Sequence, residues 1–340
     1  MKTIVLEEPE RFARADTPEP PAVGPGEALV RVSRVGICGT DLHAYRGRQP
    51  FFSYPRILGH ELGVEVVAVG EVGGGTAISP EDRCAVEPYL NCGSCRPCRL
   101  GRTNCCEKLQ VLGVHTDGGM RELIKVPVAK LHKSETLTLD QLALVETLGI
   151  GAHAVSRGAI REGEDVLVIG AGPIGLSVVQ FAQVAGANVV LLETNPARMK
   201  FCQEQFGVEH AIDAREQPLE QLRGVLKGEL PLAVFDATGS PQSMCGAFEY
   251  VANTGRLVLV SLVMAEVSFH DPEFHRRELT VFASRNSLPE DFARIISLME
   301  AGTVDTKPWI THRADFDGLV EEFPSWLDPA AGVVKAMLEL

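Results

Sequence analysis

The sequence predicts an α/β protein that combines a doubly wound parallel sheet with a β-rich domain. A strand, a glycine turn, a helix and a second strand follow one another over residues 165–193. Short alternating apolar runs such as EALVRVSRVG, at residues 27–36, are typical of β-strands and recur in the first part of the chain. The length of 340 residues is enough for two ordinary domains.

The composition is that of a globular protein, with 45% hydrophobic and 23% charged residues. The formal net charge is -13, and no block of basic residues offers a face for nucleic acid or for an anionic membrane. No signal peptide and no apolar run of about 18 residues is present, so we expect a soluble, cytoplasmic protein.

Five of the nine cysteines are crowded into NCGSCRPCRLGRTNCC, and four of these five are spaced as metal ligands are. Their C-x2-C-x2-C-x7-C spacing predicts one closed tetrahedral zinc site, although an iron–sulfur cluster also uses four thiolates. Cys105 lies beside the last of them, and the spacing favours Cys106 as the fourth ligand. The predicted ligands are Cys92, Cys95, Cys98 and Cys106.

A second candidate metal site begins with Cys38 in VGICGTDLH and His60 in LGHE. A thiolate and an imidazole suit zinc, and a catalytic zinc site keeps one position open for water or substrate. Taken alone, Cys38 is more typical of a small buried residue and His60 of a loop histidine with its own partners.

The succession from Asp165 to Glu193 is typical of a dinucleotide-binding unit. Its glycines let the backbone approach a pyrophosphate, whose charge is stabilised at the N-terminus of the helix. The residues of this turn predicted to contact the cofactor are Gly170, Gly172, Pro173, Ile174 and Gly175.

Glu193 ends the second strand, where a carboxylate accepts hydrogen bonds from a ribose 2′-OH and repels a 2′-phosphate. We therefore expect NAD rather than NADP. Arg198 either packs against the adenosine or is a solvated charge on the helix surface. Two later apolar runs, at residues 232–240 and 255–263, predict further parallel strands whose ends contact the cofactor through Thr238, Gly239, Ser261 and Leu262.

These motifs together resemble the zinc-dependent medium-chain dehydrogenases, the alcohol and polyol dehydrogenase family, over essentially the whole chain. The resemblance implies a catalytic zinc held by Cys38 and His60, with Glu61 as a direct or exchanging ligand. It also implies that Glu146 ligates this zinc, directly or through water, and that the four-cysteine loop holds a structural zinc. The chain departs from the family pattern at Thr147, where proline is usual, and at Gly63, which stands one residue early.

In such a mechanism zinc acts as a Lewis acid on the substrate hydroxyl, so that a hydride can pass to the nicotinamide. The resemblance implies that Thr40, His43 and Glu61 are catalytic: Thr40 hydrogen-bonds the reacting oxygen, and His43 passes the proton to solvent through the ribose hydroxyls. The alternatives are that Thr40 caps the helix after Cys38 and that His43 is a surface histidine.

The resemblance is to the branch that oxidises polyols and sugar acids, specifically at C5 of aldonates such as L-galactonate or L-gulonate. Arg285 offers a planar fork for a carboxylate, or it pairs with a protein carboxylate or a cofactor phosphate. Tyr45, Phe51 and Phe52 either line a substrate pocket or belong to the core.

We expect a GroES-like catalytic domain at residues 1–148 and 285–340, with a Rossmann-type domain inserted at residues 149–284 and the substrate between them. The predicted function is NAD- and zinc-dependent oxidation of a secondary hydroxyl in a homotetramer or homodimer. Alternatives are a dehydrogenase for sorbitol, 2,3-butanediol or L-threonine, and a non-enzymatic NAD-sensing zinc protein.

Overall fold

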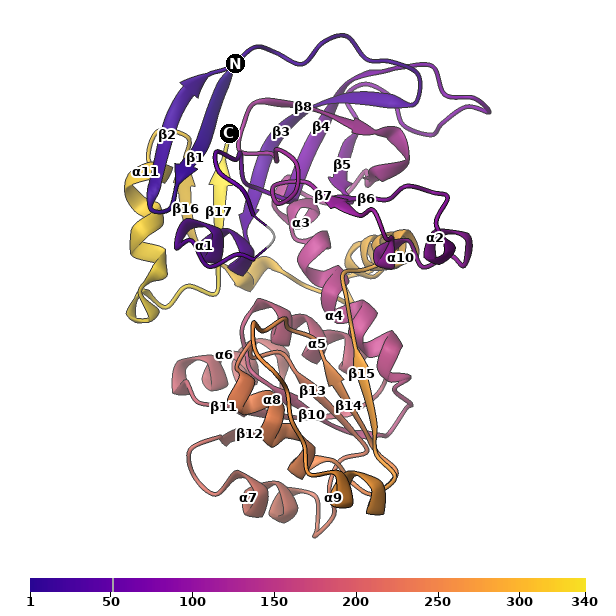
Figure 1. The fold of residues 1–340 in the computed structure, drawn as a ribbon, viewed down its shortest axis with the longest axis vertical. Coiled ribbons are helices and arrows are strands. Elements are labelled where there is room, and N and C mark those ends of the chain that lie inside the picture. The colour runs from indigo at the N-terminus through magenta and orange to yellow at the C-terminus, as the bar shows by residue number, and fades with distance from the viewer. Residues whose placement is uncertain (51) are drawn as a thin grey trace. The chain divides into compact units, whose positions relative to one another are not determined.

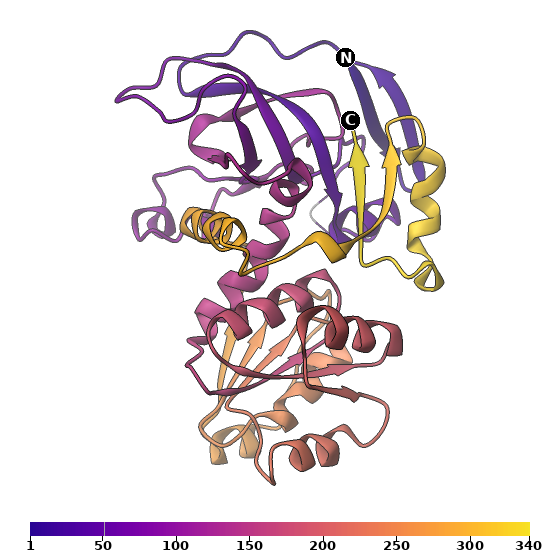
Figure 2. The ribbon, with the colours of Figure 1, turned by 180° about the vertical axis from the view of Figure 1, so that it is seen from behind.

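The computed structural model describes residues 1–50 and 52–340, which form two compact units (Figures 1 and 2). Unit 1 comprises Met1–Thr147 and Leu288–Leu340, and unit 2 comprises Leu148–Ser287. The first division falls inside helix α4 (Val145–Gly158). The boundaries predicted from the sequence lie at residues 148/149 and 284/285.

Unit 1 is built on a seven-stranded sheet in the order β16-β17-β3-β4-β5-β9, with β8 also paired to β3. The long strand β3 (Glu27–Ile37) pairs with three antiparallel neighbours and buries most of its apolar side chains. The other strands are β4 (Glu61–Val69), β5 (Arg83–Val86), β8 (Leu123–Pro127), β9 (Leu131–Lys133), β16 (Ile310–Asp315) and β17 (Lys335–Glu339).

Short elements surround this sheet. The strands β1 (Lys2–Glu8) and β2 (Arg11–Asp16) form a hairpin, and β6 (Tyr89–Leu90) pairs with β7 (Gln110–Val111). The helices are α1 (Gly39–Tyr45), α2 (Arg96–Arg99), α3 (Leu139–Ala143), α10 (Pro289–Glu300) and α11 (Leu319–Glu322). The 3-10 helices are η1 (Thr103–Cys105), η2 (Val128–Lys130), η4 (Lys307–Trp309), η5 (Phe323–Leu327) and η6 (Pro329–Ala331).

Unit 2 is a doubly wound fold with six parallel strands in the order β12-β11-β10-β13-β14-β15. Apart from Asp165 and Asp236 at their ends, the central strands β10 and β13 are apolar, because helices cover both faces of such a sheet, as Figures 1 and 2 show. The strands are β10 (Asp165–Ile169), β11 (Asn188–Glu193), β12 (His210–Asp213), β13 (Ala233–Asp236), β14 (Arg256–Leu259) and β15 (Thr280–Ala283).

The helices of unit 2 begin and end at residues suited to those positions. Gly172 is the N-cap of α5 and Pro173 is its first residue, while Asn195 caps α6 by accepting the N–H groups of Ala197 and Arg198. Gly207 ends α6 in the left-handed region with φ of 61°. The helices are α5 (Pro173–Val184), α6 (Pro196–Phe206), α7 (Pro218–Val225), α8 (Pro241–Gly246), η3 (Ala247–Tyr250) and α9 (Asp271–Arg276).

The predicted fold class, a Rossmann-type sheet inserted into a β-rich domain, is confirmed. The predicted strand at 165–169 is β10, and the predicted strand at 188–192 is β11 with one further residue. Among the described residues, no helix has the length and apolar character needed to cross a membrane.

Tyr45 belongs to the core of unit 1 rather than to an open pocket. Its ring centroid lies 5.3 Å from that of Phe12 and 5.1 Å from that of Phe323, and the side chain is 7% exposed. Its hydroxyl donates to the carbonyl of Glu10 at 3.0 Å. Of the two alternatives for Tyr45, a pocket wall or the core, these contacts favour the core, because its ring and its hydroxyl both have partners there.

Gly63, in β4, provides a test of how this strand packs against helix α3. A Cβ at Gly63 would lie 2.2 Å from the carbonyl oxygen of Leu139, which is backbone and cannot rotate away. We expect Gly63→Ala to lower the free energy of unfolding by about 1–3 kcal/mol in urea titrations. The control is Gly73→Ala, because a Cβ at Gly73 meets nothing within 4 Å. Equal stability of the two variants would contradict the packing of β4 against α3.

Candidate metal centres and dinucleotide site

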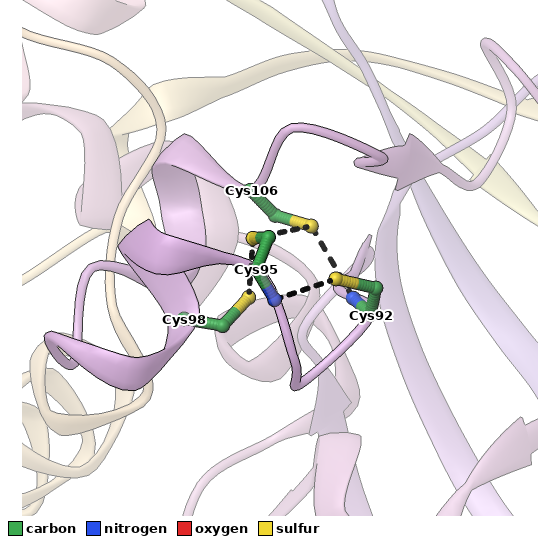
Figure 3. Close-up of side chains that lie close together, drawn as sticks. All are labelled: Cys92, Cys95, Cys98 and Cys106. Atoms are coloured by element: carbon green, nitrogen blue, oxygen red, sulfur yellow. Dashed lines mark hydrogen bonds between the residues drawn. The ribbon is translucent and has the colours of Figure 1, made fainter.

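Four cysteine side chains converge in the segment between β6 and β7 (Figure 3). Their sulfur atoms all lie within 4.8 Å of one another. The Sγ atom of Cys95 is 3.4 Å from that of Cys98 and 3.8 Å from that of Cys106. Sulfur atoms that bind one zinc ion tetrahedrally lie about 3.8 Å apart. The group Cys92, Cys95, Cys98 and Cys106 therefore fits a closed structural zinc site.

Backbone N–H groups prepare these sulfur atoms for a cation. Cys95 donates its N–H to Cys92 Sγ at 3.4 Å, and Cys92 donates its own to Cys106 Sγ at 3.3 Å. Hydrogen bonds from the backbone of Ser94 and Cys95 lower the pKa of Cys92 to about 5. The thiolate, which is the metal-binding form, is thus favoured at neutral pH. Cys105 is exposed and is not part of the group.

The second group consists of Cys38, His60 and Glu61, whose ligand atoms also lie within 4.8 Å of one another. Cys38 follows the last residue of β3, and Glu61 is the first residue of β4. These strands pair antiparallel with Gly36 opposite Glu61, so the end of one strand lies beside the start of the other. Two motifs 22 residues apart in sequence are thereby brought into one site.

Asp41 contacts two members of this group, Cys38 and His60. Its Oδ2 accepts the backbone N–H of Cys38 at 2.9 Å, and its Oδ1 lies 3.9 Å from Nδ1 of His60. Burial disfavours the charged imidazolium, but the negative charges of Cys38 and Asp41 outweigh it and raise the pKa of His60 well above its usual range. A metal cation that binds here would displace a proton from this ring.

Glu146 lies in the first turn of α4, near this group but not among the three residues within 4.8 Å. Its Oε1 accepts the hydroxyl proton of Tyr89, which is itself buried. Burial raises the pKa of Glu146, and the charge of His60 acts in the opposite direction. One thiolate, one imidazole and either of the two carboxylates supply three donors, which fits a zinc ion with an open position.

Lys335 brings a positive charge to the same place. Its Nζ lies 2.7 Å from both carboxylate oxygens of Glu61, and each side chain of the pair is 1% exposed. Burial opposes the charged form, but Glu61 and Cys38 raise the pKa of Lys335. Asp41, Tyr89 and Lys335 were missed by the sequence analysis. Only Asp41 carried a local signal, because it is the third residue of the helix that Cys38 caps.

Thr40 and His43 lie three residues apart in α1, and so on one face of that helix. Cys38 occupies the N-cap, which excludes the alternative that Thr40 caps the helix. The pKa of His43 is lowered, chiefly by desolvation of its ring and also by the positive charges of Arg46 and Arg48. The imidazole is therefore mostly neutral at pH 7 and able to accept a proton.

The glycine turn of unit 2 fits a dinucleotide pyrophosphate. Gly170 has φ of +94°, and a Cβ at Gly175 would lie 1.9 Å from the carbonyl oxygen of Gly170. The backbone thus turns tightly enough to bring the start of α5 against the end of β10. Pro173, Ile174 and Gly175 form the first turn of α5, where the helix dipole favours an anion.

The carboxylate of Glu193 is hydrogen-bonded to two neighbouring loops of unit 2. Its Oε2 accepts the N–H of Ala171 at 2.7 Å, and its Oε1 accepts those of Thr194 and Asn195 at 2.7 and 2.9 Å. These bonds tie the loop after β10 to the loop after β11. These bonds hold the carboxylate in one orientation at the end of its strand, where a cofactor ribose is expected.

A cavity of about 760 Å³ opens over these loops and is lined by Gly170, Gly172, Glu193, Arg198 and Thr238, among others. The half-buried Arg198 thus borders the cavity in which the adenosine of the cofactor is expected. The hydroxyl of Thr238 donates to Asp236 at 2.7 Å. Ser261 and Leu262 follow β14 but do not line this cavity, and Leu262 is 67% exposed.

The remaining predicted substrate residues are scattered over the chain. Arg285 is exposed and follows β15 in unit 2. Phe52 packs against the core of unit 1, with its ring centroid 4.9 Å from that of Tyr54. Phe51 lies outside the described residues.

Two protein-family models match the chain. The alcohol dehydrogenase GroES-like domain matches residues 24–136, and the zinc-binding dehydrogenase domain matches residues 173–301. The chain belongs to the zinc-binding alcohol dehydrogenase family. The family resemblance is thereby confirmed, and the protein is an oxidoreductase rather than a non-enzymatic sensor.

Individual relatives cover nearly the whole dehydrogenase. The chain is 42% identical over 323 residues to L-galactonate-5-dehydrogenase of Escherichia coli K12, covering 95% of this chain and 94% of that protein. It is 30% identical to 2-dehydro-3-deoxy-L-galactonate 5-dehydrogenase of Pseudoalteromonas atlantica, covering 92% of each. The crystal structure of an alcohol dehydrogenase from E. coli CFT073 complexed with NADH matches with a TM-score of 0.92 at 32% identity, over 100% and 99% of the two chains.

The four-cysteine site is tested by removing one ligand. We expect Cys98→Ser to lose one zinc per chain and to unfold at a lower temperature, because a structural zinc site contributes directly to folding. Elemental analysis and thermal denaturation measure both effects. The matched control is Cys105→Ser, which removes an exposed thiol from the same loop and should leave the zinc content unchanged. Zinc loss in Cys105→Ser, or its retention in Cys98→Ser, would contradict the ligand set.

Proposed function

We propose that this dehydrogenase oxidises a secondary hydroxyl of a sugar acid or polyol with NAD, at a zinc ion held by Cys38 and His60 with Glu61 or Glu146 as the third ligand. The convergence of Cys38, His60 and Glu61 within 4.8 Å is the observation that carries the proposal. Its donors fit an open zinc site, whereas the four-cysteine group is closed by sulfur. When bound, zinc supplies a Lewis acid for the hydroxyl, and NAD accepts the hydride.

The residues of α1 handle the proton that the hydroxyl loses. The hydroxyl oxygen of Thr40 accepts a hydrogen bond from the substrate hydroxyl. His43 then takes up the proton at its neutral imidazole and passes it to water. Thr40 and His43 suit these roles because they share one face of a helix whose N-cap is the metal ligand Cys38. The lowered pKa of His43 keeps its acceptor nitrogen available at neutral pH.

The proposed substrate is an aldonate oxidised at C5, with L-galactonate and L-gulonate as the first choices. The support is the 42% identity to L-galactonate-5-dehydrogenase, together with the second relative that acts on a galactonate derivative. Arg285 is proposed to receive the substrate carboxylate as a planar fork. Buried polar atoms on either side of it lack hydrogen-bond partners among the described residues, as expected where a ligand binds: Ser284 Oγ, Asn286 Nδ2 and Ser287 Oγ.

A homo-oligomer is proposed from the exposed edge of the unit 2 sheet. Strand β15 is the last of the six strands, and its Val281 is 40% exposed. Leu262 and Met264, in the segment before it, are 67% and 74% exposed. An apolar strand edge of this kind is suited to pairing with a second copy of the chain. A cytoplasmic location is proposed because the nine cysteines are not joined in disulfides in the described structure.

A substrate panel tests the proposed function. Initial rates of NADH formation are measured with L-galactonate, L-gulonate, sorbitol, 2,3-butanediol and L-threonine. We expect the aldonates to give the highest kcat/KM. Absence of turnover with both aldonates, together with good turnover of 2,3-butanediol or L-threonine, would contradict the aldonate assignment and identify the better substrate as the alternative.

The cofactor preference is tested at Glu193. We expect Glu193→Ala to weaken NAD binding more than NADP binding, because the carboxylate that accepts from the ribose and repels a 2′-phosphate is removed. Fluorescence titration with NADH and NADPH measures the ratio of the two dissociation constants. Glu209→Ala, which removes an exposed carboxylate elsewhere in unit 2, should leave the ratio unchanged. An unchanged ratio in Glu193→Ala would contradict the assignment.

A further inference from the structure

The ion pair between Lys335 and Glu61 is buried in unit 1, away from solvent. The ammonium of Lys335 has three N–H groups, and its acceptors are Oε1 and Oε2 of Glu61, both at 2.7 Å, and the carbonyl oxygen of Ile37 at 3.2 Å. Every donor of this ammonium is therefore used inside the protein. Lys335 is 2% exposed, and Glu61 is fully buried.

The strand order explains how these two side chains meet. Strand β3 lies between β17, which carries Lys335, and β4, which carries Glu61. Gly36 is the residue of β3 opposite Glu61, and a Cβ there would lie 2.1 Å from Glu61 Oε2. The absence of a side chain at Gly36 thus opens the path by which the carboxylate of Glu61 crosses β3 to reach Lys335.

The same carboxylate faces the proposed catalytic zinc. Glu61 lies within 4.8 Å of the ligand atoms of Cys38 and His60, so its oxygens are within reach of both a metal ion and the ammonium. A carboxylate that accepts hydrogen bonds from an ammonium has less negative charge to offer a metal. When ionised, the thiolate, Glu61 and Glu146 carry three negative charges, which a divalent cation and one ammonium balance.

We propose that Lys335 is a positioning residue for Glu61 that limits how firmly this carboxylate holds the catalytic zinc. The inference rests on the proposed function only in placing that zinc at Cys38 and His60. Lys335 fixes the carboxylate at the edge of the site and withdraws part of its charge. The bound metal keeps more of its positive charge for the substrate hydroxyl, and zinc exchanges more readily than it would with Glu61 alone.

A purely structural ion pair would behave differently. Such a pair would join β17 to β4, and its loss would lower the stability of unit 1 without changing the metal. Lys130 and Glu87 form a comparison within the same unit, since they are also buried and ion-paired and are not among the residues that converge on the zinc. Lys130→Met is therefore the matched control for Lys335→Met.

The first experiment follows zinc release from the loaded protein to a chromogenic chelator. The four-cysteine site provides a separate kinetic phase and an internal reference. We expect Lys335→Met to slow the phase of the catalytic zinc by about tenfold, equivalent to about 1.4 kcal/mol. We expect Lys130→Met to leave both phases unchanged.

The second experiment replaces the catalytic zinc with Co2+ and records its d–d absorption bands, which report ligand geometry. We expect Lys335→Met to shift these bands, because Glu61 moves toward the metal once the ammonium is gone. Lys335→Arg keeps the charge but alters the position of the donors, so it should shift the bands as well. This variant keeps the test available if Lys335→Met does not fold.

Activity supplies an independent third readout. With full zinc occupancy, we expect Lys335→Met to lower kcat more than it changes KM for the best substrate. Unchanged zinc release and unchanged cobalt bands in both Lys335 variants would overturn the proposal, as would equal changes in Lys130→Met. None of the metal readouts depends on the substrate, so a wrong substrate assignment would not produce these results.

Discussion

The antiparallel pairing of β3 with β4 is the constraint on which the candidate active site depends. It places Gly36 opposite Glu61, so that Cys38 at the end of one strand meets His60 and Glu61 at the start of the other. Helix α1 begins at Cys38 and carries Thr40 and His43 on one face. A shift of this pairing by one residue would move Glu61 to the opposite face of the sheet and separate the ligands.

The two proposed zinc sites differ in how the chain builds them. The four-cysteine site is contained within fifteen residues, and its geometry is set by a short loop and its own N–H groups. The other site collects residues from the start of α1, which follows β3, and from β4, α4 and β17. A local site of sulfur atoms suits a structural metal, whereas a site assembled from distant segments couples the metal to the fold of the whole unit.

This difference explains what the sequence could and could not predict. The cysteine spacing and the glycine turn are local patterns, so the convergence of the four cysteines and the elements β10, α5 and β11 could be predicted closely. Lys335 and Tyr89 gave no such signal, because their roles arise from strand order and from side-chain contacts across the sheet. Tyr45 was open to two interpretations for the same reason: the aromatic cluster that buries it includes Phe323 from a distant segment.

The most direct test of the central claim, that one chain carries two separate zinc centres, is anomalous diffraction at the zinc edge from crystals of the zinc-loaded protein. The account predicts two peaks per chain, one enclosed by the four sulfur atoms of the cysteine loop and one beside Cys38 and His60, with Lys335 still bonded to Glu61. A single peak in the cysteine loop, or a second peak away from Cys38 and His60, would contradict it.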